Sequence, residues 1–224
     1  MPKYIAVSRC KGDDRPNSYA AFLRELAPLK LEHWAGLRRY VVNLVDVAPS
    51  FSDGSPVPYD IVEEAWFETG NDQAAAFESA VVNRTANALI AQTYVYQVSE
   101  RVQLDDMRPP RVGERSPGVK AIYLVRRNEQ LNDQEAMQRW REHAPLAKAH
   151  HAGMSRYVQN GVIVALTQGA PVVNGIAELH FPTQEDLDHR IYDSERGRAA
   201  IRADVSTLVA ESVALYTSEY VLRA

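Results

Sequence analysis

The sequence predicts an α+β fold in which two ferredoxin-like units follow one another along the chain. Two observations predict it. Residues 142–162 (EHAPLAKAHHAGMSRYVQNGV) and residues 25–45 (ELAPLKLEHWAGLRRYVVNLV) align without a gap, and 12 of the 21 positions are identical. The same order of patterns surrounds both segments: strand, helix, strand, strand, helix, strand. This order is the split βαβ arrangement of ferredoxin-like units.

The first unit is assigned to residues 1–104. Residues 3–9 (KYIAVSR) alternate in polarity and are rich in β-branched side chains, which predicts a strand. Asn17 is the predicted N-cap of a helix that runs to about residue 29, and Pro28 should kink or end it. The remaining elements are strands from Leu37 and Ile61, a helical segment over about residues 72–89 and a closing strand from Tyr94.

The second unit is assigned to residues 118–224, and the charged, proline-rich residues 105–117 form a predicted linker. A strand is predicted at residues 120–126. Asn132 or Asp133 should cap the next helix, which Pro145 should kink or end. The remaining elements are strands from Met154, Gly175 and Val213 and a helical segment over about residues 183–209.

An antiparallel sheet of this kind carries its helices on one face and leaves the other face bare. A bare apolar face needs a cover, and a second sheet in the same chain can supply it. The sequence therefore predicts tandem ferredoxin-like (βαββαβ) repeats packed sheet to sheet, as an intramolecular dimeric α/β barrel. A hydrophobic content of 46% is sufficient for such a core.

Composition restricts the class of protein. A formal net charge of −4 supplies no basic surface for nucleic acid. No segment approaches the roughly 18 apolar residues that a membrane span needs, and the N-terminus lacks the apolar run of a signal peptide. Cys10 is the single cysteine, which favours a reducing compartment. We therefore expect a cytoplasmic protein that binds neither nucleic acid nor membrane; a homodimer of the barrel is left open.

Four segments of the second unit resemble one known family. They are KAIYLVRR from Lys120, WREHAPLA from Trp140, GMSRYVQN from Gly153 and NGIAELHF from Asn174. Together they resemble the EthD domain of the dimeric α/β-barrel superfamily, over about residues 118–222, with the first unit a degenerate copy. The resemblance implies cofactor-free chemistry, or an accessory role, on small hydrophobic, aromatic or polyketide-like compounds. Relatives in the superfamily include isomerases, polyketide cyclases, decarboxylases and haem-binding enzymes.

His143 is the leading catalytic candidate, because the first unit has Leu26 at the corresponding position. It lies three residues after Trp140, beside the apolar stripe of the predicted helix. An imidazole next to a buried cavity can act as a general acid or base near neutral pH. The structural alternative is a core histidine bonded to a carbonyl, for which the Arg141 carbonyl, freed by Pro145, is a candidate.

Glu178 and His180 are two residues apart on a predicted strand and therefore share one face. His180 corresponds to Trp66 and is a second catalytic candidate. Glu178 recurs in the first unit as Glu64, which favours a structural pair with Arg156, although it is also kept as a substrate-binding candidate. Whether His143 and His180 share a pocket is left open.

The predicted function is that of a cofactor-independent lyase or isomerase acting on a small hydrophobic, aromatic or polyketide-like molecule. Met137, Trp140 and Tyr157 would form its substrate pocket. The alternatives are a non-catalytic binding or accessory protein of a degradation pathway and a haem-binding barrel with His143 as axial ligand. No metal site is expected, because no carboxylate–histidine spacing typical of metal ligands occurs.

Overall fold

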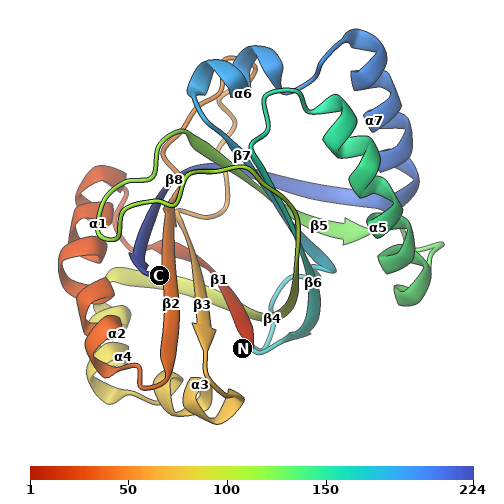
Figure 1. Ribbon diagram of the computed structural model, residues 1–224. Helices are drawn as coiled ribbons and strands as arrows, with labels where there is room; N and C mark the ends of the chain where they lie inside the picture. Colours follow the sequence, from red (N-terminus) through yellow and green to blue (C-terminus); the bar gives the residue numbers. More distant parts are fainter.

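The computed structural model describes all residues, 1–224, and shows a closed barrel of eight antiparallel strands. The order around the barrel is β1-β3-β2-β8-β5-β7-β6-β4. Strand β2 pairs with β8 and β4 pairs with β6, so hydrogen bonds join the two halves of the chain at both seams. Figure 1 shows the helices of the two halves on opposite outer sides of the barrel.

Each half runs strand, helix, strand, strand, helix, strand. The first half contains β1 (Lys3–Cys10), α1 (Arg15–Ala21), η1 (Phe22–Leu26), α2 (Ala27–His33), β2 (Leu37–Leu44), β3 (Ile61–Phe67), α3 (Gly70–Phe77), α4 (Ala80–Leu89) and β4 (Ile90–Asp105). The second half contains β5 (Val119–Arg127), α5 (Asp133–His150), β6 (Arg156–Ala165), β7 (Gly175–Phe181), α6 (Gln184–Arg190), α7 (Glu195–Leu208) and β8 (Val209–Arg223). The long closing helical segments of the prediction are therefore two helices each.

The helix starts were predicted unequally well. Asn132 caps α5, and its side chain accepts a hydrogen bond from the Glu135 backbone N–H, as predicted. The prediction of Asn17 as the first cap is wrong. Asp14 caps α1 and accepts from the Asn17 backbone N–H, because Pro16 fits the first turn of a helix, where no N–H is needed.

The two prolines do not end their helices. In the first half, the π-helical turn η1 ends at Leu26, and Pro28 lies in the first turn of α2, which follows it. A π turn widens the helix and gives the proline ring room against the carbonyl four residues earlier. In the second half, α5 continues as an α-helix past Pro145 to His150. The helix therefore presents its whole inner face to the sheet.

The predicted linker is held against the barrel. The backbone N–H of Ser116 donates to the Glu219 carbonyl at 2.7 Å, and that of Gly113 donates to the Val221 carbonyl at 2.8 Å. Residues 113–116 thus lie along β8, within the segment that connects β4 to β5 (Figure 1). None of the helices is both long and apolar enough to cross a membrane.

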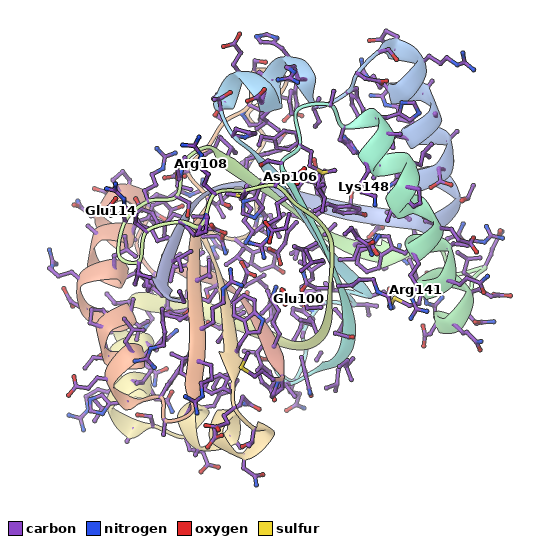
Figure 2. The ribbon with its side chains drawn as sticks, in the orientation of Figure 1. Glu100, Asp106, Arg108, Glu114, Arg141 and Lys148 are labelled. Carbon is purple, nitrogen blue, oxygen red and sulfur yellow. The ribbon has the colours of Figure 1, made fainter.

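Charged side chains occupy part of the barrel interior (Figure 2). The Lys3 ammonium lies 2.8 Å from Glu64 and 2.9 Å from Glu178. Lys120 contacts the same two carboxylates and lies 3.2 Å from Glu219. Burial would raise the pKa of Glu219, but Lys120 above all lowers it to about 2. We call this group of oppositely charged side chains, which compensate one another, the barrel charge network.

Candidate functional site

A cavity of about 580 Å³ lies in the second half, between helices α5 and α7 and the outer face of the barrel. Of its 30 lining residues, 22 are hydrophobic. The lining comes from both helices, from β5, β6, β7 and β8, and from the loop before β7. Its volume and apolar character are those of a pocket for a small organic molecule. We call it the C-terminal cavity.

Two glycines set the walls of the C-terminal cavity. A methyl group on Gly161 would lie 2.5 Å from Met137 Cε, and one on Gly175 would lie 2.6 Å from Trp140 Cζ3. Because neither strand residue carries a side chain, Met137 and Trp140 of α5 can lie close against the sheet. Both side chains line the cavity, where the sequence placed them.

His143 lines the C-terminal cavity and is 8% exposed. Its Nδ1 lies 2.7 Å from Oδ2 of Asp204 on α7. A carboxylate only accepts hydrogen bonds, so this contact places the proton of the neutral ring on Nδ1. Nε2 then carries the free lone pair, and it has no hydrogen-bond partner. The structural alternative, a bond from His143 to the Arg141 carbonyl, is therefore wrong.

Tyr157 also lines the C-terminal cavity. Burial raises the pKa of Tyr157 to about 12, so the phenol is neutral at physiological pH. Its oxygen accepts a hydrogen bond from Gln159 Nε2 at 2.9 Å, and this amide also donates to the Trp140 carbonyl at 2.7 Å. Gln159 thus fixes both the phenol and the inner wall of α5, while the phenol keeps its own proton for a ligand.

His151 is a further polar residue of the C-terminal cavity. Burial lowers its pKa, so the ring is neutral. Its Nδ1 lies 2.5 Å from the Ile191 carbonyl, which fixes the proton on that nitrogen. The ring also packs against Tyr192, with 5.2 Å between the ring centroids. His151 is therefore held in place by these two contacts.

Glu178 and His180 do not line the C-terminal cavity. Glu178 belongs to the barrel charge network, with Lys120 at 2.7 Å, so its expected pair with Arg156 is wrong. His180 lies in the barrel interior, with Nε2 3.7 Å from Glu219. Burial lowers the pKa of His180 to about 4. The two strand residues do share one face, but it is the inner face, which α5 does not cover.

Sequence reasoning did not find Asp204 or His151. Asp204 corresponds to Thr85 of the first half, and His151 corresponds to Trp34. The signal that singled out His143, a polar residue where the other half has an apolar one, is present at His151 but not at Asp204, because Thr85 is itself polar. Asp204 could be found only once the distant helices α5 and α7 were known to meet. No group of three or more His, Cys, Asp or Glu side chains converges as metal ligands would.

Residues 128–212 match the family model of the EthD domain. This part of the chain is therefore similar to EthD domains. The match includes α5, β6, β7 and α7, and therefore the His143–Asp204 pair. The EthD match lies wholly in the second half of the barrel.

Solved structures share the architecture of the whole chain. The chain is similar to an anthrone oxidase-like protein, with a TM-score of 0.67, 12% identity and coverage of 99% of this chain and 93% of that one. It is also similar to a mutant chlorite dismutase from Candidatus Nitrospira defluvii, with a TM-score of 0.54, 12% identity and coverage of 99% and 92%. At these identities the similarity shows the fold alone. A search of curated proteins gives no match.

Proposed function

We propose that the C-terminal cavity binds a small hydrophobic, aromatic or polyketide-like molecule and that His143 transfers a proton on it. The reaction would be that of a lyase or isomerase, without a cofactor. The observation that carries this proposal is the 2.7 Å contact between His143 Nδ1 and Asp204 in an apolar cavity. A pair of this kind, with a buried histidine and a partly exposed carboxylate, combines a free ring nitrogen with a charge that stabilises the protonated ring.

Each polar residue has a separate role in the proposed step. Nε2 of His143 removes a proton from a carbon that a carbonyl group makes acidic, either directly next to it or, as in anthrone, conjugated with it through an aromatic ring. Asp204 acts as a positioning residue, which keeps the lone pair on Nε2 and stabilises the imidazolium that forms. Tyr157, neutral and still carrying its proton, donates to the developing enolate oxygen. Return of the proton to another carbon completes an isomerisation.

The lining residues favour an uncharged ligand. Arg127 is the only lysine or arginine among them, and its Nε already donates to Asp133 at 2.8 Å. A charged ligand would lose its hydration on entering the cavity and would find no unpaired cationic side chain to replace it. The step therefore suits a neutral aromatic ketone or a related carbon acid.

The test uses anthrone, an aromatic ketone with an acidic methylene group. Solvent deuterium should enter that methylene faster with the protein than without it, as followed by mass spectrometry. His143→Ala should lower the protein-dependent rate by about 10²–10⁴-fold, which is the usual contribution of a general base. The melting temperature is the control for folding. Unchanged exchange in a folded His143→Ala protein would remove His143 from the reaction.

An accessory role without turnover is the second candidate. It is favoured by the cavity itself, because 22 apolar lining residues suffice for binding without catalysis. Under this alternative anthrone would bind, as detected by a saturable shift of the Trp140 indole N–H resonance, but no deuterium would enter it. Exchange that depends on His143 would exclude the accessory role as a complete account.

Haem is the third candidate, and the residues fit it poorly. His143 Nε2 could serve as an axial ligand. The two propionate groups of haem, however, would find only Arg127, which is already paired with Asp133. A Soret band after reconstitution, absent in His143→Ala, would support haem binding against this reasoning.

We further infer that residues 1–104 and 118–224 are duplicated ferredoxin-like units joined by residues 105–117. The corresponding lysines Lys3 and Lys120 and the corresponding carboxylates Glu64 and Glu178 support a duplication. A cytoplasmic location is supported by the single cysteine, Cys10. A homodimer of the barrel remains a proposal, which light scattering of the purified protein would test.

A further inference from the structure

The first half contains a second cavity, of about 320 Å³, between helices α2 and α4 and the outer face of the barrel. It is lined by 17 residues, of which 11 are hydrophobic. Its place in the first half corresponds to that of the C-terminal cavity in the second half. We call it the N-terminal cavity. Leu26 stands where the second half has His143, so the proton transfer proposed above has no counterpart here.

A buried ion pair lines the N-terminal cavity. The Lys30 ammonium lies 2.5 Å from Glu63, and the two residues are 6% and 4% exposed. The Tyr40 hydroxyl also donates to Glu63. An ammonium has three N–H donors, and Glu63 is the only oxygen to which Lys30 is hydrogen-bonded. Its other neighbours include the rings of Trp34 and Phe22, with centroids at 4.8 and 5.3 Å.

Trp34 provides the second observation. It lines the N-terminal cavity and is 8% exposed, and its indole Nε1 has no hydrogen-bond partner. A buried N–H without an acceptor costs about 1–3 kcal/mol, so such groups call for an explanation. An oxygen atom of a bound molecule would supply the missing acceptor.

We propose that the N-terminal cavity is a second ligand site, for a small uncharged aromatic molecule that carries a carbonyl oxygen. This oxygen accepts hydrogen bonds from Trp34 Nε1 and from Lys30 Nζ, while the apolar lining covers the ring. Glu63 already balances the charge of Lys30, so an anion would add an uncompensated buried charge. The site binds its ligand and does not transform it, and it goes beyond the function proposed for the C-terminal cavity.

The three tryptophans make one experiment sufficient. Trp34 lines the N-terminal cavity, Trp140 lines the C-terminal cavity, and Trp66 donates to Glu100 at 3.2 Å inside the barrel. In the ¹⁵N-labelled protein, the three indole N–H resonances therefore report separately on the two cavities and on the barrel. Acetophenone is the probe. Ethylbenzene, which has a similar shape but no oxygen, is the matched control.

Acetophenone should shift the Trp34 indole resonance in a saturable way and leave that of Trp66 in place. Ethylbenzene should bind at the Trp34 site at least about tenfold more weakly, because it cannot replace the missing hydrogen bonds. The comparison uses the unaltered protein, so it does not depend on any variant folding. A Trp34 resonance that does not respond to acetophenone would overturn the proposal, and so would equal affinities for the two probes.

Ala65→Leu locates the site independently. Ala65 lines the N-terminal cavity, and the corresponding residue of the second half is Leu179. The larger side chain should fill the cavity and abolish the Trp34 shift, while any response of Trp140 stays as it was. An unchanged Trp34 shift in this folded variant would place acetophenone elsewhere and contradict the proposal. The response of Trp140 tests the C-terminal cavity, so the two proposals can fail separately.

Discussion

The two halves of the molecule share a barrel but differ in the layer between sheet and helices. In the first half, Tyr4, Lys30 and Glu63 project into this layer. The corresponding residues of the second half are Ala121, Ala147 and Ala177. Three alanines in place of three large side chains accompany cavities of about 320 and 580 Å³. We therefore expect function to depend on the loss of these large side chains from the second half as much as on the presence of His143 and Asp204 there.

On the inner face of the barrel, by contrast, the two halves keep the same charged residues at corresponding positions. Lys3 and Lys120 occupy corresponding positions, and both contact Glu64 and Glu178. Each half thus supplies one lysine and one of the shared carboxylates. A substitution of one of these charged residues would leave buried charges of the other half unpaired. The two halves are therefore expected to keep the same residues on this face. The outer layers have no such mutual dependence, and there the halves are free to differ.

The largest expected effect comes from the face that the halves share. Lys120→Met should lower the free energy of unfolding by about 3–5 kcal/mol, because it leaves buried carboxylates without a cation. Lys3→Met should have an effect of similar size if the two positions are equivalent. Lys148→Met, on the exposed face of α5, is the matched control and should change stability by less than about 0.5 kcal/mol. Urea unfolding measures all three (Lys148 is labelled in Figure 2).

An effect close to this size is expected where the inner faces differ, at His180 and Trp66. The pKa of His180 is lowered to about 4 in the folded protein, so only the unfolded chain takes up this proton between about pH 6.5 and 4. The free energy of unfolding should fall by about 3 kcal/mol as the pH decreases from about 6.5 to 4. Below about pH 4, His180 should cause no further loss of stability.

His180→Trp, which copies the first half, should remove that loss. His180→Gln, which does not titrate, controls for the size of tryptophan. Acid sensitivity due to Glu219 would remain in both variants, because its pKa of about 2 places its contribution below about pH 4.3. Identical stability–pH curves for wild type and both variants between pH 6.5 and 4 would contradict the assigned shift.

Exchange of one packing pair tests the outer layer. Gly175 and Trp140 correspond to Ile61 and Leu23 of the first half. Gly175→Ile alone should cost about 1–3 kcal/mol, since even its Cβ would lie 2.6 Å from Trp140. Adding Trp140→Leu should recover most of this loss. Additive losses in thermal unfolding of the double variant would show that the pair does not exchange as a unit.

The smallest expected effect concerns the positioning residue. Asp204→Asn keeps the shape of the side chain but removes the charge that stabilises a protonated His143. The anthrone exchange rate should fall by about 10–100-fold, less than in His143→Ala. Thr85→Asn, at the corresponding position of the first half, is the matched control. A folded Asp204→Asn protein with the wild-type rate would separate Asp204 from the chemistry.

Most of the architecture followed from local patterns that are visible in the sequence. The strand at residues 120–126, the Asn132 cap and the order of elements depend on neighbouring residues, and the structure has them. The cap at Asp14 was missed because Pro16 and Asn17 suit more than one starting point for the helix. The continuation of α2 past Pro28 and of α5 past Pro145 depends on packing, which a local rule does not contain.

The site was predictable only in part, for a geometric reason. Met137, Trp140, His143 and Tyr157 lie on α5 and β6, whose faces follow from periodicity. Glu178 was assigned to the wrong partner because Lys3 reaches it from the other half, 175 residues away in sequence. Asp204 likewise depends on the contact between α5 and α7, which sequence spacing does not specify.

The central claim is that the second half holds a histidine whose proton is fixed by Asp204 and whose other nitrogen is free to act as a base. The ¹⁵N chemical shifts of the His143 ring, measured in mildly alkaline solution where an imidazole is neutral, test this most directly. A protonated Nδ1 and an unprotonated Nε2 are predicted, with this preference weakened in Asp204→Asn. A proton on Nε2 in the unaltered protein would contradict the account.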